Sequence, residues 1–143
     1  MKKVSIAFCL LILFLLVSCR FPETYNFKHP TDDIIEISIV ELSFGENGKL
    51  IETKIRQIAD TESFLADFKK IECYMYFGDP LGVTPEGVED TVIKITYENG
   101  EYELINWKGQ AEYTSEKGLI YYAGYCVFDE KQFESLLENS GTD

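Results

Sequence analysis

Two Asn-Gly dipeptides, Asn47-Gly48 and Asn99-Gly100, each separate two runs in which apolar and polar residues alternate. Both residues of such a dipeptide tolerate a positive φ angle, which the type I′ turn between two antiparallel strands requires. The sequence therefore predicts two β-hairpins. These hairpins supply most of the sheet that the chain can form.

A two-residue turn gives each hairpin a register in which apolar residues face apolar ones. In the first hairpin the predicted pairs are Glu46 with Lys49, Phe44 with Ile51, Leu42 with Thr53, Glu41 with Lys54 and Val40 with Ile55. In the second they are Tyr97 with Tyr102, Ile95 with Leu104 and Val92 with Trp107. The apolar positions of the first strand change parity between Ile39 and Val40, which predicts a β-bulge there.

Two short helices are predicted after aspartates that can cap them, Asp60 and Asp129. Gln132 stands at the third helical position of the second helix, as in a capping box. The apolar faces of the helices consist of Phe64, Leu65, Phe68 and Ile71 in the first, and Phe133, Leu136 and Leu137 in the second. The predicted fold is α+β, a single mainly antiparallel sheet of five or six strands with both helices packed on one face. The strand, aspartate and helix succession occurs twice, by duplication of a unit or by repeated use of one capping solution.

The chain begins with Lys2 and Lys3 followed by an apolar run over residues 4–17. This run is shorter than the roughly 20 apolar residues that span a bilayer comfortably. A basic start with a short apolar run is typical of a secretory signal peptide. The alternative is an uncleaved membrane anchor.

The run ends in Leu16-Val17-Ser18-Cys19, which resembles the lipobox of bacterial lipoproteins. In that family the cysteine thiol is lipidated, the bond before it is cut, and the new amine is often acylated, for example with palmitate. The resemblance implies a protein of the cell envelope that is anchored to a membrane through lipid on Cys19, since two acyl chains hold stably. Arg20 stands where an aspartate would favour the inner membrane. The expected location is therefore the outer membrane of a Gram-negative source or the outer leaflet of the plasma membrane of a Gram-positive one.

The predicted organisation is a signal peptide over residues 1–18, a lipidated tether over 19–31 and one domain over 32–143. The tether prediction rests on Pro22, Pro30 and the lack of an apolar period. His29 lies in this segment without a carboxylate or second histidine at ligand spacing. No metal-binding or catalytic role is therefore expected for it.

Removal of Lys2 and Lys3 with the signal leaves 11 basic residues against 25 acidic ones, a formal net charge of −14. Such a charge argues against nucleic acid as a partner. It favours either simple solubility near a surface or capture of a basic partner or cation.

Four cysteines become two once Cys9 leaves with the signal and Cys19 takes the lipid. Cys73 and Cys126 are then either a disulfide, which an oxidising compartment permits, or two small core residues. A disulfide would close a loop of 53 residues and stabilise the fold by about 4 kcal/mol in the chain-entropy model.

Residues 78–90 form the longest break in the pattern, with two prolines and three glycines. Loops of this kind often carry function. Its acidic residues are Asp79, Glu86, Glu89 and Asp90. Their carboxylates suit calcium, but their spacing does not match the alternating ligands of a calcium-binding helix-loop-helix motif, so a solvated acidic loop is the simpler interpretation.

Aromatic residues supply a second candidate binding surface. Its members are Tyr74, Tyr76, Trp107, Tyr121 and Tyr125. If one sheet face packs the helices, some of these rings must lie on the other face, where exposed aromatics often contact a protein or a sugar. The alternative is that the sheet curls and buries them.

No nucleophile elbow, zinc-ligand spacing or phosphate-binding glycine loop is present in the sequence. We therefore expect a non-enzymatic envelope lipoprotein without cofactor or metal that binds a protein or a polysaccharide. The alternatives are an envelope hydrolase that works through carboxylates such as Glu86, Glu89 and Asp90, and an inhibitor or immunity-type protein that uses its acidic surface.

Overall fold

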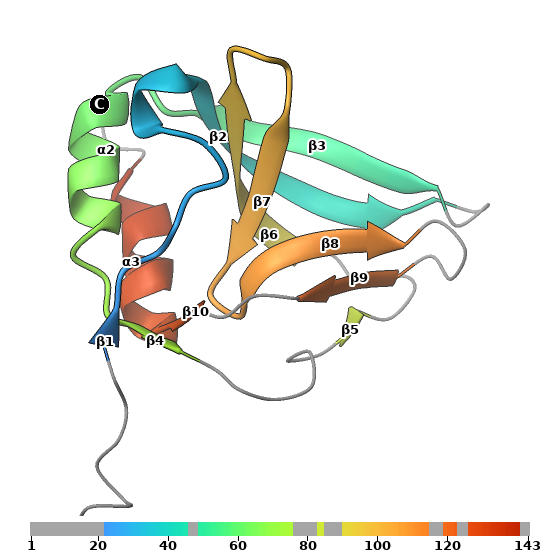
Figure 1. The fold of residues 1–143 in the computed structure, drawn as a ribbon. Coiled ribbons are helices and arrows are strands. Elements are labelled where there is room, and N and C mark those ends of the chain that lie inside the picture. Colours follow the sequence, from blue (N-terminus) through green and yellow to red (C-terminus); the bar gives the residue numbers. More distant parts are fainter. Residues whose placement is uncertain are drawn as a thin grey trace, which may run out of the picture.

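The computed structural model describes residues 22–45, 49–75, 83–84, 90–114, 119–122 and 126–140. Within these residues the chain is an α+β fold with antiparallel strand pairing, which confirms the predicted class. The strands are divided between two sheets where one was predicted: a seven-stranded sheet in the order β3-β2-β6-β7-β8-β9-β5 and a three-stranded sheet in the order β1-β4-β10. Helices α2 and α3 lie side by side at one end of the larger sheet, next to the smaller one (Figure 1).

The elements follow the chain in this order: β1 (Pro22–Glu23), a 3-10 helix (Thr31–Asp33), β2 (Ile34–Phe44), β3 (Leu50–Gln57), α2 (Thr61–Phe68), β4 (Cys73–Met75), β5 (Val83–Thr84), β6 (Asp90–Tyr97), β7 (Tyr102–Asn106), β8 (Gly109–Thr114), β9 (Leu119–Tyr122), β10 (Cys126–Phe128) and α3 (Glu130–Asn139).

Strand β2 is buried on both faces, which explains the parity change in its sequence. Ile37 and Ile39 belong to the larger hydrophobic cluster, beneath the helices, whereas Val40 and Leu42 belong to a smaller one on the other face. The pairing of β2 with β6 runs without a shift from Ile37 to Leu42, so β2 itself is regular there.

The predicted bulge is present in the pairing of β2 with β3, between Ile39 and Val40. Val40 pairs with Lys54 and Ile39 with Arg56, so the additional residue is Ile55 of β3. The bulge is thus confirmed in place, and the extra residue belongs to the edge strand.

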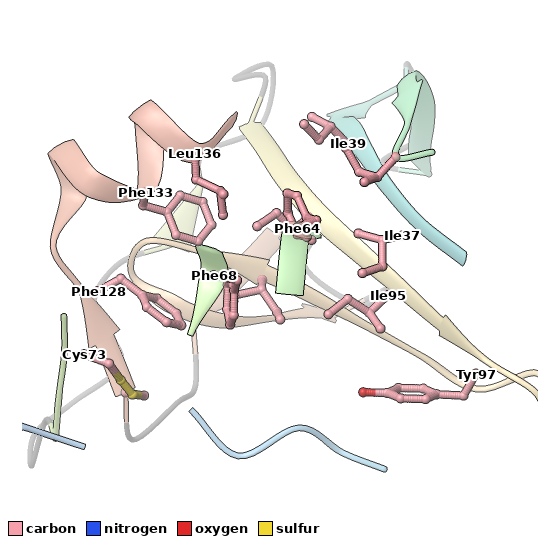
Figure 2. Packing of buried hydrophobic residues seen from close by; sticks show 14 residues of the cluster. Ile37, Ile39, Phe64, Phe68, Cys73, Ile95, Tyr97, Phe128, Phe133 and Leu136 are labelled. Atoms are coloured by element: carbon pink, nitrogen blue, oxygen red, sulfur yellow. A yellow bond between two sulfur atoms is a disulfide. The ribbon is translucent and has the colours of Figure 1, made fainter. Parts of the chain in front are cut away.

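The larger cluster lies between the sheet and the two helices (Figure 2). Phe64 and Phe68 of α2 and Phe133 and Leu136 of α3 are buried against strand residues such as Ile95. The smaller cluster joins β2 and β6 to Leu104 and Ala111, because the sheet bends strongly at β8. The larger sheet therefore covers part of its own second face.

Both predicted hairpin registers are wrong by one residue. In the second hairpin Ile95 pairs with Glu103 and Lys94 with Leu104. Its loop has three residues, since the Tyr97 N–H donates to the Glu101 carbonyl over 2.9 Å. Gly100 has φ 82°, the left-handed conformation that closes a three-residue loop.

The first hairpin shows the same displacement. Leu42 pairs with Glu52 and Val40 with Lys54, and the Gly45 N–H donates to the Lys49 carbonyl over 2.9 Å. Three residues, 46–48, therefore separate the paired ends, where two were predicted; Asn47-Gly48 itself lies outside the described residues.

Both helix caps are confirmed. The Asp60 carboxylate accepts from the Ser63 N–H over 2.9 Å, and the Asp129 carboxylate accepts from the Gln132 N–H over 3.0 Å. The Gln132 side chain accepts from the Glu72 N–H instead of turning back to its own cap. It thus fastens the start of α3 to the chain just before β4.

The prediction of a tether up to residue 31 is wrong from Pro22 onward. Pro22 and Glu23 pair with β4, and the rings of Tyr25 and Phe27 lie 5.6 and 5.7 Å from that of Phe68. Every second side chain from residue 25 to residue 29 turns inward, the period of an extended segment against a core. The domain therefore begins near Pro22, while Cys19 lies outside the described residues.

Cys73 of β4 and Cys126 of β10 are joined by a disulfide with a Cα–Cα distance of 5.7 Å. Both are buried in the larger cluster (Figure 2). The two alternatives left open by the sequence are thus combined, because the bonded sulfurs are also core atoms. The bond links β4 and β10, which are neighbours in the three-stranded sheet, through two cysteines that are 53 residues apart.

No helix in the described part of the chain is long and apolar enough to cross a membrane.

Candidate functional site

A buried carboxylate is the most unusual chemical feature of the described residues. Glu103 lies in β7 with 2% of its surface exposed, opposite Ile95 of β6. The one-residue shift of the hairpin turns this side chain toward the helix-side core, because successive strand residues alternate between faces. Charged groups are rarely buried to this extent unless they are paired or hydrogen-bonded.

Three donors satisfy this carboxylate. The Tyr25 hydroxyl donates to Oε2 over 2.6 Å, and the hydroxyl of the fully buried Tyr97 donates to Oε1. The Lys28 backbone N–H donates to Oε1 over 3.4 Å. Tyr25 and Lys28 come from the N-terminal segment, so the cluster fastens that segment to the β6–β7 hairpin. We call Glu103, Tyr25 and Tyr97 the carboxylate clasp.

The tyrosines of the clasp are held in their protonated form. Burial, followed by the nearby Glu103 charge, raises the pKa of Tyr25 well above its usual range. Burial and the hydrogen bond to Glu103 likewise raise the pKa of Tyr97. Both hydroxyls therefore act as hydrogen-bond donors to the buried Glu103 carboxylate. With raised pKa values they stay protonated and do not serve as tyrosinate nucleophiles.

A polar rim lies outside the clasp. His29 contacts the Glu101 carboxylate through Nε2, and the His29 ring meets that of Tyr97 edge-on at a centroid distance of 4.8 Å. Lys28 Nζ lies 3.5 Å from the same carboxylate. These contacts lower the pKa of Glu101, through the His29 hydrogen bond first and the Lys28 charge second.

Sequence reasoning missed this rim because it treated His29 as part of a loose tether without a carboxylate nearby. That interpretation is wrong, since Glu101 approaches it from a hairpin 72 residues away. A shallow depression of about 360 Å³ opens beside it, lined by His29, Asp33, Tyr97, Glu98 and Asn99. The alternation of Tyr25, Phe27 and His29 was the signal that could have revealed an ordered segment. Across the described ranges, no group of three or more His, Cys, Asp or Glu side chains is arranged to hold a metal ion.

The structure describes the side chains of two members of the predicted aromatic surface, Trp107 and Tyr74. Trp107, between β7 and β8, is half-buried against the larger cluster, and its carbonyl accepts from the Phe128 N–H over 2.8 Å. Tyr74 is half-buried in β4, and its hydroxyl contacts Glu72. Tyr121 belongs to β9 by its backbone, while Tyr76 and Tyr125 lie outside the described residues.

One of the predicted loop acids is described. Asp90 starts β6, and its Oδ1 accepts from Nδ2 of the buried Asn106 over 3.0 Å. Asn106 Nδ2 also donates to the Thr91 carbonyl over 2.9 Å, so this contact fixes the start of β6 to the end of β7. Asp79, Glu86 and Glu89 lie outside the described residues.

A larger polar cavity, of about 490 Å³, lies between the start of α2 and the end of α3. Arg56 of β3 lines it and donates through Nη2 to the Leu137 carbonyl and, over 3.1 Å, to Ser140 Oγ. The guanidinium thereby supplies a donor to the Leu137 carbonyl, in the last turn of α3, where carbonyls lack an N–H partner further along the helix. The walls of the cavity also include Asp60 and Asp67.

The fold and these sites define an α+β protein whose N-terminal segment is fastened to its core by a buried charge. No protein-family model, curated protein or solved structure matches the chain.

Proposed function

We propose that this chain is a lipid-anchored, non-enzymatic binding protein of the bacterial cell envelope. The observation that carries the proposal is the disulfide between Cys73 and Cys126. It accounts for both cysteines that follow residue 19 and is of a kind that persists in oxidising compartments such as the envelope. The lipobox-like Leu16-Val17-Ser18-Cys19 supplies the attachment.

The packing of the N-terminal segment supports a short anchor. Because Pro22 is already paired with β4, three peptide units lie between Cys19 and the domain, a reach of about 10 Å when extended. The lipidated domain would then sit close to the bilayer, with its three-stranded sheet nearest the attachment. Two acyl chains would hold it there stably.

The test of attachment uses the full chain expressed in a bacterium and labelled with a radioactive or clickable fatty acid. Label on the wild type and on Cys9→Ser, but not on Cys19→Ser, is the expected result. Mass spectrometry should find a mature N-terminus at a lipid-modified Cys19. An uncut, unlabelled chain in the soluble cytosolic fraction would overturn the proposal.

The partner is proposed to be a protein or a polysaccharide of the envelope, bound by the surface that the mainly acidic domain presents. Co-sedimentation with purified cell-wall polysaccharide and cross-linking in intact cells followed by mass spectrometry separate the two classes. The hydrolase alternative rests on Glu86, Glu89 and Asp90, of which Asp90 alone belongs to the described residues.

A further inference from the structure

Strand β3 is the edge of the larger sheet and carries exposed apolar side chains. Among the described strands it pairs with β2 alone, and it lies along the outer border of the sheet in Figure 1. Ile51 and Ile55 are 46% and 54% exposed. An eight-residue edge strand with open backbone groups and exposed isoleucines is a template for pairing with another strand.

The other face of β3 carries charges of both signs. Glu52 accepts from Lys94 Nζ over 2.5 Å, and Lys54 contacts Glu36. The strand thus presents apolar residues and Thr53 on one face and alternating charges on the other, because successive side chains alternate.

We propose that β3 pairs antiparallel with β3 of a second copy of this chain, about a two-fold axis at Thr53. In this register Thr53 faces Thr53 of the other copy, Ile51 faces its Ile55, and Glu52 faces its Lys54. Apolar residues therefore face apolar ones across the two strands, and each acidic residue faces a basic one, as cross-strand pairing favours. The pairing is isologous, the arrangement of most homodimers.

Charge selects this register from its neighbours. If the two sheets join into one with the helices of both copies on the same side, the two-fold axis must pass through a residue of β3. The neighbouring registers therefore place this axis at Glu52 or at Lys54. The first sets Glu52 opposite Glu52 of the other copy, and the second sets Lys54 opposite Lys54. Like charges directly opposite one another destabilise a strand pair.

The contact is small and self-limiting. Residues 51–55 of each copy take part, and the isologous pairing uses the β3 edge of both copies, so it closes as a dimer and does not continue as a fibre. Such an interface lies below the roughly 1,200 Å² of a stable complex and is weak in dilute solution. The pairing does not depend on the lipid anchor, although co-attachment to one membrane would raise the effective concentration.

Register-specific cysteine cross-linking tests the proposal on the full chain, in whichever fraction it resides. Under mild oxidation Thr53→Cys should form a reducible dimer with itself. Ile51→Cys and Ile55→Cys should each stay monomeric alone and form a dimer when the two variants are co-expressed. Lys49→Cys, an exposed site on the same hairpin, is the matched control and should stay monomeric.

A charge variant tests the register independently. In the Thr53→Cys background, Lys54→Glu places a second glutamate opposite Glu52 in both symmetry-related pairs. The repulsion should lower the cross-linked fraction by about tenfold. Glu36→Gln removes the contact of Lys54 within one chain and should leave cross-linking unchanged. Circular dichroism checks that each variant is folded. A monomeric Thr53→Cys chain, or equal cross-linking at residues 49, 51, 53 and 55, would overturn the proposal.

Discussion

The hydroxyl of Tyr25 donates a 2.6 Å hydrogen bond to the carboxylate of Glu103, which lies 78 residues further along the chain. This contact ties the segment that follows the lipobox-like sequence to the centre of the domain. It also supplies one of the donors that make a carboxylate with 2% exposure tolerable in the core.

Removal of that donor should destabilise the domain. Tyr25→Phe keeps the ring against Phe68 but leaves one oxygen of Glu103 without its partner, at an expected cost of about 1–3 kcal/mol in the free energy of unfolding. Urea denaturation followed by circular dichroism measures the loss. Tyr102→Phe is the matched control, because that tyrosine is 49% exposed and should change stability by less than about 0.5 kcal/mol. Equal effects of both variants would contradict a special role for the clasp.

The disulfide should be measurable as both chemistry and stability. Thiol counting on the unfolded chain should detect the Cys73 and Cys126 thiols only after reduction. The Cys73→Ser/Cys126→Ser double variant should lose about 4 kcal/mol of unfolding free energy, the chain-entropy value for a loop of 53 residues. Reaction of the Cys73 and Cys126 thiols without reductant, located by peptide mapping, would show that the bond does not form in the protein.

The turn glycine of the second hairpin should resist substitution for a backbone reason. Gly100 has φ 82°, and nothing lies within 4 Å of a Cβ placed there. Gly100→Ala should therefore cost about 1 kcal/mol through left-handed strain alone, and Gly100→Asn should cost less because asparagine tolerates this conformation. Thermal unfolding of the two variants checks the order. A neutral Gly100→Ala would mean that the three-residue loop does not need this backbone angle.

Acid should weaken the contacts that Glu101 makes in the polar rim. The contacts of Glu101 with His29 and Lys28 lower its pKa below the usual value of 4.5. A carboxyl with a lowered folded-state pKa adds stability above its unfolded pKa and loses it as the pH falls through the folded one. The contribution should therefore be complete above pH 4.5 and fade below it. NMR titration of Glu101 in the wild type and in His29→Ala checks this, and an unchanged pKa in the variant would rule out the histidine contact as the cause.

The features that could be predicted from sequence are those that depend on neighbouring residues. Asp60 and Asp129 cap their helices because a short carboxylate reaches the N–H three residues later whatever lies beyond. The parity change at Ile39-Val40 coincides with the bulge between β2 and β3, although its own cause is the burial of β2 on both faces and the extra residue belongs to β3. The chain reversal near Asn99-Gly100 is likewise local, since glycine supplies the positive φ of the turn.

Tertiary structure decided the register, the burial of Glu103 and the start of the domain. A two-residue loop and a three-residue loop both satisfy the turn chemistry of Asn99-Gly100, yet they turn opposite faces of β7 toward the core. The three-residue loop becomes favourable when Tyr25 and Tyr97 are present to receive the carboxylate. Local sequence thus fixed where the chain turns and where its helices begin, whereas contacts between distant residues fixed which side chains the turns bury, because the energy of a buried charge depends on partners that only the folded chain brings together.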